Sequence, residues 1–346
     1  MSRTAVVLFN LGGPDGPDAV KPFLFNLFND PAIIGLPNPL RWLLAKFISS
    51  RRAPVAREIY GHIGGKSPLL ELTQAQADAL EGALADAGEV KVFICMRYWH
   101  PMSDATARAV KDFGPDRVVL LPLYPQYSTT TSASSLKDWH RAAAAVGLDV
   151  PAHAVCCYPT EPGWTQAQAK LIKEALAASP GARVLFSAHG LPKKVVDAGD
   201  PYQWQVEQTA QAVVDKLAAD GTAVDDWQVC YQSRVGPLEW IGPATEAELA
   251  RAGQDSVPVI VVPIAFVSEH SETLVELDIE YREEASRLGV PSYTRVPAVG
   301  TEPAFIEGLA GLVRDQLGRG GEISCGLGTG ARVCPAAHAR CPLQQR

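Results

Sequence analysis

The sequence predicts an α/β protein made of two doubly wound (Rossmann-like) lobes, each with a parallel four-stranded sheet. Short apolar runs rich in β-branched residues alternate with helical patterns along most of the chain, which is typical of parallel sheets. Runs such as residues 257–263 are almost entirely apolar, as expected of strands covered on both faces. A break rich in proline and glycine near residues 159–163 separates two groups of strands. A single eight-stranded barrel fits less well, because the spacings between strands are uneven.

The expected elements follow from these runs in order. The strands are expected at residues 5–9, 90–95, 117–122, 152–157, 183–186, 227–231, 257–263 and 293–296. The helices are expected at residues 69–87, 103–113, 132–145, 164–178, 202–219, 244–251, 271–287 and 303–317. The chain then divides into an N-terminal lobe of residues 1–160, a C-terminal lobe of residues 161–318 and a tail of residues 319–346.

Composition narrows the class of protein. The net charge of −7 gives no global basic field to attract nucleic acid. The chain starts without a signal-peptide pattern and has no apolar run of about 18 residues, so we expect a cytoplasmic protein without a spanning helix. In that reducing compartment the seven cysteines are expected to be buried thiols or metal ligands rather than disulfides.

Glycine, aromatic and polar residues gather where the expected strands end. Six segments have this character, at residues 11–14, 96–101, 123–128, 187–192, 232–237 and 265–272. Open α/β sheets bind ligands at the carboxyl ends of their strands. The six segments together predict one site. The sequence 64–67 resembles the end of a phosphate-binding loop, but Tyr60 stands where that loop needs a glycine.

Two of these segments contain candidate catalytic residues. A lone histidine is more often structural, but His189 follows an apolar strand and is followed by chain-breaking glycine and proline, which favours a functional role. Glu272, Glu276 and Glu280 recur every four residues on an expected helix, and such like-charged neighbours repel one another. A row of carboxylates headed by imidazole suits a divalent metal such as Fe²⁺. A π-turn would align this spacing better, but the sequence leaves open whether one exists.

The strand-end segments also supply residues for a flat apolar slot with polar edges, suited to a large planar amphiphile. The candidates for this slot are Leu11, Tyr60, Ser67, Arg97, Tyr98, Tyr124, Gln232, Ser233, Trp240 and Phe266.

At these residues the chain resembles the ferrochelatases, the enzymes of the last step of haem synthesis. The resemblance covers residues 5–317 in order and is most specific at Phe186–Pro192 and at Pro263–Tyr281. It implies that ferrous iron is inserted into protoporphyrin IX with release of two protons. It implies that His189 and Glu272 flank the porphyrin centre, and that Glu276, Glu280 and His270 serve the path of iron or protons. The resemblance also implies that His189 and Glu272 belong to the iron path. A neutral imidazole can bind a metal or accept a proton but cannot do both at once, so both roles are open for His189, and we hypothesise that it accepts protons.

The resemblance also implies that Arg97 and Ser67 meet the porphyrin propionates, where guanidinium is the strong polar partner. The apolar stretch 36–52, which ends in two arginines, has two interpretations. It is either a buried helix, or a lip that contacts the inner face of the membrane peripherally. Both monomers and homodimers occur in the family, and the sequence does not choose between them.

Three cysteines lie in the glycine- and proline-rich tail, Cys325, Cys334 and Cys341, and their spacing alone is a weak signal. The resemblance implies a [2Fe–2S] cluster with a fourth ligand from the body of the protein. Thr129 stands where the animal-type enzymes have that cysteine, so either Cys157 or Cys156 is expected to replace it. Structural zinc on the same ligands is the alternative.

Three other functions are alternatives to this interpretation. A coproporphyrin III ferrochelatase shares the same ring-binding requirements, and the sequence does not decide between the two porphyrins. A cobalt or nickel chelatase of a related tetrapyrrole pathway would not need the row from Glu272 to Glu280. A protein that only carries haem would leave that row without a role.

Overall fold

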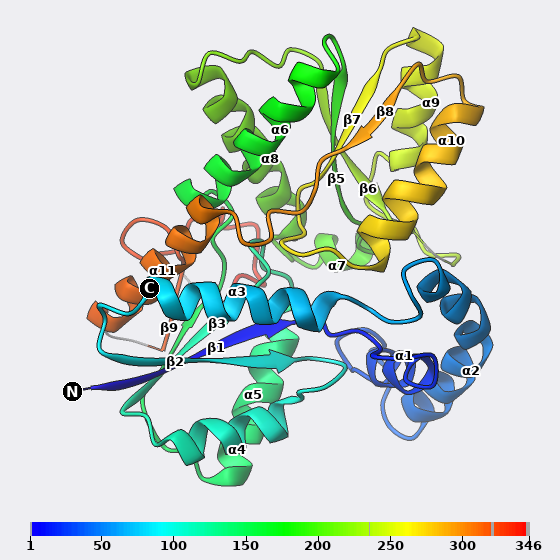
Figure 1. The fold of residues 1–346 in the computed structure, drawn as a ribbon. Coiled ribbons are helices and arrows are strands. Elements are labelled where there is room, and N and C mark those ends of the chain that lie inside the picture. The colour runs from blue at the N-terminus through cyan, green and yellow to red at the C-terminus, as the bar shows by residue number, and fades with distance from the viewer. Residues whose placement is uncertain (1, 235, 320–321, 344–346) are drawn as a thin grey trace. The chain divides into compact units, whose positions relative to one another are not determined.

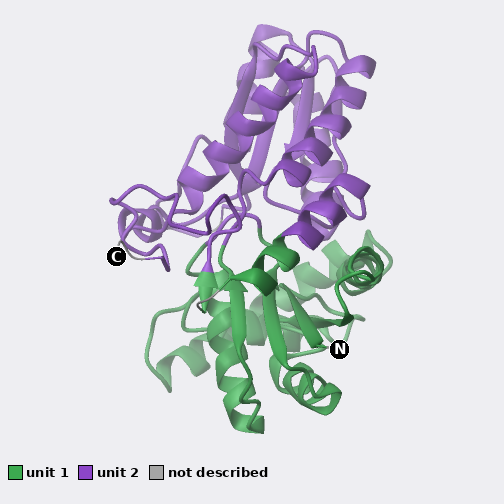
Figure 2. Ribbon diagram, turned by 90° about the vertical axis from the view of Figure 1, so that its left-hand side faces the viewer, with its two compact units in different colours: residues 1–124, 128–156, 312–323 green, residues 125–127, 157–311, 324–346 purple. Residues whose placement is uncertain are grey.

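Both predicted sheets are present in the computed structural model of the chain, which describes residues 2–234, 236–319 and 322–343 (Figure 1). The chain divides into two units, coloured separately in Figure 2. Unit 1 contains residues 1–124, 128–156 and 312–323, and unit 2 contains residues 125–127, 157–311 and 324–346.

The sheet of unit 1 has the order β2-β1-β3-β4-β9. The central strand β1 pairs in parallel with β2 and β3, and β3 pairs in parallel with β4. A two-residue strand, β9, extends the four predicted strands to five. The strands are β1 (Arg3–Asn10), β2 (Glu89–Met96), β3 (Arg117–Pro122), β4 (Ala152–Val155) and β9 (Ile323–Ser324).

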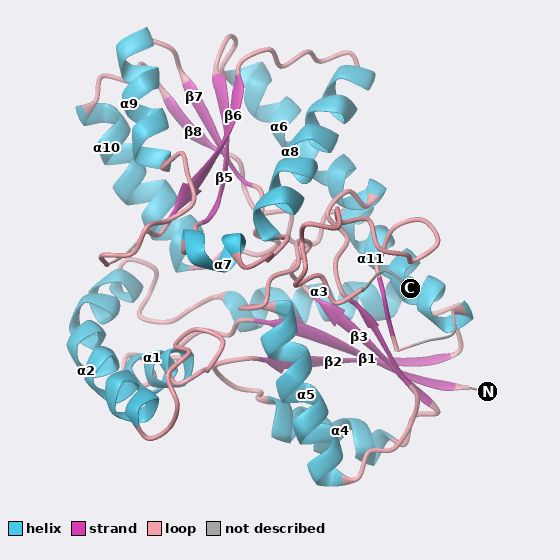
Figure 3. Ribbon diagram, turned by 180° about the vertical axis from the view of Figure 1, so that it is seen from behind, coloured by secondary structure: helices cyan, strands magenta, loops and turns pink. Residues whose placement is uncertain are grey.

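Helices cover both faces of this sheet, with α3 on one face and α4 and α5 on the other (Figure 3). Trp139 of α5 packs edge-on against Phe9 of β1 in the core beneath α4 and α5. The helices α1 and α2 pack against each other and bury Phe23 and Ala53. The helices of unit 1 are α1 (Val20–Phe28), α2 (Leu40–Gly61), α3 (Leu69–Ala83), α4 (Ser103–Phe113) and α5 (Ser132–Val146).

The sheet of unit 2 has the order β6-β5-β7-β8, and all of its pairings are parallel. Its strands are β5 (Arg183–His189), β6 (Trp227–Gln232), β7 (Val259–Pro263) and β8 (Tyr293–Arg295). The strands β5 and β7 are buried along almost their whole length, which explains why residues 257–263 lack a polar face.

Helices α6 and α8 cover one face of this sheet, and α9, η1 and α10 cover the other (Figure 1). These helices are α6 (Pro162–Ala178), α8 (Tyr202–Ala219), α9 (Thr245–Asp255), η1 (Glu272–Glu280) and α10 (Tyr281–Arg287). The short α7 (Lys193–Asp197) follows β5, and α11 (Pro303–Gly318) follows β8. No helix in the described ranges is long and apolar enough to cross a membrane.

The structure corrects three expectations about the elements. β4 ends at Val155, so Cys156 and Cys157 lie beyond the strand rather than within it. The helices α1 and α7 were not predicted: Pro22 lies in the first turn of α1, where proline is tolerated, and α7 has only five residues. The expected helix 271–287 is two elements, because η1 is a π-helix that continues into α10.

Candidate active site

The first feature of the site is a direct contact between His189 and Glu272. His189 is the last residue of β5, and Glu272 is the first residue of η1, which follows the neighbouring strand β7. The Nδ1 atom of His189 lies 2.8 Å from Oε2 of Glu272. The imidazole keeps 40% of its side-chain surface accessible. A histidine held at Nδ1 by a carboxylate has its second nitrogen, Nε2, free to face a ligand.

Glycine at position 190 allows this loop to close. A Cβ atom there would lie 3.0 Å from the carbonyl oxygen of Gln232 and 3.2 Å from the ring of Trp240. Because any other residue would press against both groups, the close packing after His189 favours glycine at this position. The ring of Trp240, which was predicted to bind porphyrin, therefore lies close to the loop that follows His189.

The π-helix brings Glu276 to the same site. Ser233 donates to this carboxylate twice, from its backbone N–H (2.8 Å to Oε1) and from its hydroxyl (2.5 Å to Oε2). Gln232 donates from Nε2 at 3.1 Å, and the hydroxyl of Tyr281 lies 3.3 Å from Oε1. The Ser233 hydroxyl also lies 3.4 Å from Oε2 of Glu272, so it links the two acids.

Ser233 reaches Glu276 through an uncommon backbone conformation. Its φ of +60° lies in the left-handed region that residues with a Cβ adopt infrequently. It directly follows β6, and this turn aims both its N–H and its hydroxyl at the carboxylate. Backbone outliers of this kind are found where a site fixes a particular geometry.

The charges of the site act on one another. Burial alone would lower the pKa of His189, but Glu272 and, more weakly, Glu276 outweigh it and raise this pKa above 6.5. Burial would raise the pKa of Glu272, yet His189 and His270 hold it well below its usual value. Burial and repulsion by Glu272 raise the pKa of Glu276. The two acids therefore have opposite tendencies: Glu272 keeps its charge, and Glu276 gains a proton more easily.

His270 supports the start of η1. Its Nδ1 accepts the backbone N–H of Glu272 at 3.1 Å, and its ring packs edge-on against Phe266 at 4.6 Å. Burial lowers the pKa of His270. Glu280, the last acid of the predicted row, is exposed at the end of η1.

Comparisons with known proteins show which family the chain belongs to. A model of the ferrochelatase family matches residues 3–317. The chain belongs to the ferrochelatase family. Ferrochelatase from Caulobacter vibrioides is 55% identical over 350 residues, which cover 99% of this chain and 98% of that protein. Ferrochelatase from Phenylobacterium zucineum is 54% identical over 345 residues, with 98% and 97% covered. The chain is thus a metal chelatase whose substrates are ferrous iron and a porphyrin.

Solved chelatase structures share the fold. SirB from Bacillus subtilis with Fe³⁺ aligns with a TM-score of 0.55 at 14% identity and covers 92% of this chain and 96% of that one. The sirohydrochlorin chelatase SirB from Bacillus subtilis subspecies spizizenii, in complex with cobalt, aligns with a TM-score of 0.53 at 13% identity, covering 91% and 95%. At such identities the likeness concerns the ferrochelatase fold alone.

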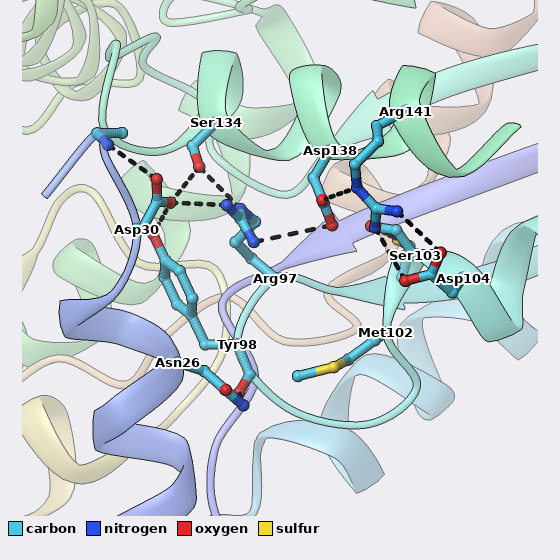
Figure 4. Close-up of polar contacts among 12 residues, drawn as sticks. Asn26, Asp30, Arg97, Tyr98, Met102, Ser103, Asp104, Ser134, Asp138 and Arg141 are labelled. Carbon is cyan, nitrogen blue, oxygen red and sulfur yellow. Dashed lines mark hydrogen bonds and ion pairs between the residues drawn. The ribbon is translucent and has the colours of Figure 1, made fainter. Parts of the chain in front are cut away.

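In this ferrochelatase-family chain, Arg97 has carboxylate partners within unit 1 (Figure 4). Its guanidinium donates to the buried Asp30 at 2.9 Å and to the hydroxyl of Ser134 at 2.8 Å, and it lies 3.8 Å from Asp138. The hydroxyl of Tyr98 donates to the same Asp30 oxygen at 2.8 Å. Arg97 and Tyr98 are therefore parts of a buried polar network, which the sequence did not indicate because Asp30 lies in an unrelated segment.

The residues that were predicted to bind porphyrin are divided between the two units. Leu11 and Tyr60 pack with Tyr98 in the apolar cluster of α1 and α2. Ser67 fits against Gly13, where a Cβ would approach its side chain to 2.4 Å. In unit 1 are Leu11, Tyr60, Ser67, Arg97, Tyr98 and Tyr124, and in unit 2 are Gln232, Ser233, Trp240 and Phe266.

Four cysteines gather in unit 2, at a place remote in sequence from His189. The Sγ atoms of Cys157 and Cys325 are 3.7 Å apart, and both side chains are buried. Cys334 and Cys341 form a second pair joined by a hydrogen bond, which lowers the pKa of Cys341 to about 7. The backbone N–H of Gly326 donates to the carbonyl of Cys157 at 2.8 Å, which fixes the tail to the segment after β4.

Gln205 of α8 joins the two pairs. Its Nε2 lies 3.4 Å from Sγ of Cys157 and 3.1 Å from Sγ of Cys334. Within the described ranges, no three histidine, cysteine or acidic side chains are arranged to hold a single metal ion. The thiols come together as two pairs, Cys157 with Cys325 and Cys334 with Cys341.

Proposed function

We propose that the chain inserts Fe²⁺ into protoporphyrin IX at His189, with Glu272 and Glu276 as its acidic partners. The observation that carries this assignment is the contact between His189 and Glu272, joined to Glu276 through the Ser233 hydroxyl. Metal insertion replaces two pyrrole N–H protons, so the site needs a group that accepts protons and a group that retains negative charge.

His189 is suited to accept the protons. When Nδ1–H donates to the charged Glu272, the neutral ring presents a lone pair on Nε2. A proton that arrives on Nε2 gives an imidazolium stabilised by the adjacent carboxylate. Before the transfer, Glu272 thus fixes the tautomer of His189. After the transfer, it stabilises the positive charge of the imidazolium, as in other paired histidine–carboxylate sites.

Glu276 is suited to take part next, as a cation ligand or as a proton carrier. Its four hydrogen-bond donors favour the carboxylate, whereas burial and the charge of Glu272 favour the protonated form. A group balanced in this way changes its protonation when a cation arrives or a proton is passed on. We propose that Glu280 and His270 contribute at the outer end and at the base of this path, as the family resemblance implies.

The test is insertion itself. The purified protein is incubated anaerobically with protoporphyrin IX and Fe²⁺, and loss of porphyrin fluorescence is followed, with coproporphyrin III and with Co²⁺ or Ni²⁺ in parallel. The proposal expects the highest kcat/KM with protoporphyrin IX and Fe²⁺. A higher value with coproporphyrin III or with another metal would overturn the assigned substrates.

For the propionates, we propose contacts with Ser67 and Arg97. Because Asp30 and Asp138 already neutralise part of the charge of Arg97, its attraction for a propionate is weakened. Ser67→Ala and Arg97→Lys are therefore compared by their KM for porphyrin. A raised KM in both variants supports the contacts, and an unchanged KM in both contradicts them.

We also propose that α2 contacts the membrane surface. The alternative of a buried helix disagrees with exposed fractions of 57% for Leu40, 55% for Leu43 and 62% for Phe47. Small residues on the opposite side, Ala45 and Ala53, are buried instead. Lysine and arginine side chains follow on the same helix and suit lipid headgroups. These features support peripheral attachment to a membrane surface, and we propose that the protein is cytoplasmic and attaches to the inner face of the membrane.

For the cysteines, we propose a [2Fe–2S] cluster held by Cys157, Cys325, Cys334 and Cys341. Four buried thiols in two pairs fit two irons with two cysteine ligands each. We choose Cys157 because its Sγ lies 3.7 Å from Sγ of Cys325 in the tail. Such a cluster supplies one-electron redox chemistry when bound. Visible absorbance and two irons per chain in anaerobically purified protein would support it, and a colourless zinc protein would refute it.

A further inference from the structure

Gln205 has an unusual set of partners for a buried glutamine. It lies on α8 with none of its surface exposed. Its carbonyl Oε1 accepts the backbone N–H of Tyr127 at 2.7 Å. Since a backbone N–H can only donate, this contact fixes which end of the amide is oxygen. The NH₂ group must therefore face the sulfurs of Cys157 and Cys334.

The two N–H bonds of this amide have one sulfur in each cysteine pair as acceptors. Cys157 belongs to the pair with Cys325, and Cys334 belongs to the pair with Cys341. A neutral thiol is a weak acceptor, whereas a thiolate accepts a charge-assisted hydrogen bond. A buried amide aimed at two sulfurs is thus well satisfied only when those sulfurs are deprotonated, as they are when they bind metal.

The helix also holds the turn that orients the amide. Thr209, one helical turn after Gln205, accepts Nε2 of Gln126 at 2.9 Å and donates to the carbonyl of Gln205 at 2.9 Å. Gln126 and Tyr127 are therefore fastened to α8 at two points. Because the turn is fixed, the direction of the Gln205 amide is fixed before any metal binds.

From this geometry we propose that Gln205 is a positioning residue of the four-cysteine site, donating one hydrogen bond to each cysteine pair and raising the reduction potential of the cluster there. The inference rests on the proposed [2Fe–2S] cluster. Adding an electron increases the negative charge on the sulfurs, so donors to those sulfurs stabilise the reduced form more than the oxidised form.

The experiment compares three variants of the full-length, cluster-loaded protein. Q205L removes both donors, and Q205E keeps an acceptor for Tyr127 but places a carboxylate near the thiolates. Q203L is the matched control, because Gln203 lies on the same helix and donates to Glu207 instead. The midpoint potential is measured by spectroelectrochemistry, with circular dichroism to verify folding and iron content to verify loading.

We expect the midpoint potential of Q205L to be more negative than that of the wild type, that of Q205E to be lower still, and that of Q203L to be unchanged. If Q205L folds normally but fails to retain a cluster that Q203L retains, that result supports the positioning role. The midpoint potential is then measured on Q205E instead. A Q205L or Q205E potential equal to that of the wild type would overturn the inference while leaving the cluster intact. A colourless or zinc-containing wild type would overturn the cluster, and the inference with it.

Discussion

At the scale of single residues, one hydrogen bond determines the chemical state of the site. The contact between His189 and Glu272 joins two residues 83 positions apart in sequence. It gives the imidazole a defined tautomer and raises its pKa, and it leaves Glu272 charged. A histidine with a raised pKa and a carboxylate that keeps its charge therefore lie side by side, as the proposed exchange of two protons for Fe²⁺ requires.

This arrangement predicts the effect of pH. A base must be neutral to accept a proton, so activity should fall as the pH drops below the raised pKa of His189. We expect the acidic limb of kcat/KM to have its midpoint above 6.5. In Glu272→Gln the carboxylate is absent, and the His189 pKa measured by NMR titration should fall below the wild-type value. A His189 pKa that stays in place in this variant would contradict the pairing.

Removal of the histidine itself should reduce turnover strongly. Positioned proton transfer contributes about 10²- to 10⁴-fold to a rate. We expect a decrease of this size in kcat for His189→Ala at saturating iron, with the KM for porphyrin little changed. Full turnover under these conditions would show that His189 does not accept the protons.

Ser233 provides a third test. Its hydroxyl donates to Glu276, and a hydrogen bond to a charged group contributes about 1.5–3 kcal/mol. Ser233→Gly removes the hydroxyl while relieving the backbone strain at φ +60°. We expect kcat/KM for Fe²⁺ to fall roughly 10-fold or more, with thermal stability maintained. If activity is retained, the hydroxyl does not hold Glu276 in its working position.

Much of this residue-scale geometry was predictable, and some was not. The position of His189 at a strand end and the spacing of Glu272 and Glu276 predicted where these side chains would meet. The contacts of Gln232 and Ser233 with Glu276 were missed, because a strand-end polar residue gives no sign of which neighbour it will bind. Nothing in the sequence indicated that Gln205 would contact the cysteines, since a single glutamine in a helix usually faces solvent.

At the scale of elements, two helices have properties that their sequences only partly indicate. The sequence did not decide whether η1 is a π-helix, because the stability of η1 depends on the contacts that Glu272 and Glu276 make in the fold. Over residues 40–53, the helix α2 is the reverse of an ordinary amphipathic helix, with small residues packed inward and large apolar residues outward. The sequence offered burial as an alternative because apolar composition does not reveal which side is covered.

The exposed side of α2 predicts a membrane affinity. Burying a large apolar side chain is worth about 1.5–3 kcal/mol, so Leu43→Glu and Phe47→Glu should each weaken binding roughly 10-fold or more. The measurement is cosedimentation with vesicles that contain anionic lipid. The variant Val55→Glu, which changes another exposed position near the end of the same helix, tests whether the effect is specific to the 40–47 region. Equal binding of all variants would exclude this helix as the contact.

At the scale of the whole molecule, residues 324–343 return to a segment that is distant in sequence. The tail would have little packing of its own, yet Cys325, Cys334 and Cys341 are all buried in unit 2. The backbone N–H of Arg340 donates to the carbonyl of Gly199 at 3.0 Å, and Gly199 is tight enough that a Cβ would approach Ala339 to 2.8 Å. The sequence predicted which cysteines belong together, but it did not predict this docking surface. Glycine and alanine carry no functional group that would mark Gly199 and Ala339 as contact partners.

This arrangement predicts that the proposed cluster and the docking of the tail stabilise each other. Ligand binding to the folded state alone adds to stability, so removing one ligand with Cys341→Ser should loosen the tail before the cores of the two units. We expect faster hydrogen exchange across residues 324–343, while strands β1, β5 and β7 stay protected. The melting temperature should fall by about 2–4 °C for each kcal/mol lost. Cys95→Ser is the matched control, because Cys95 is a buried thiol of β2, distant in sequence from the tail. Uniform loss of protection in Cys341→Ser would show instead that the four-cysteine site supports the whole fold rather than the tail.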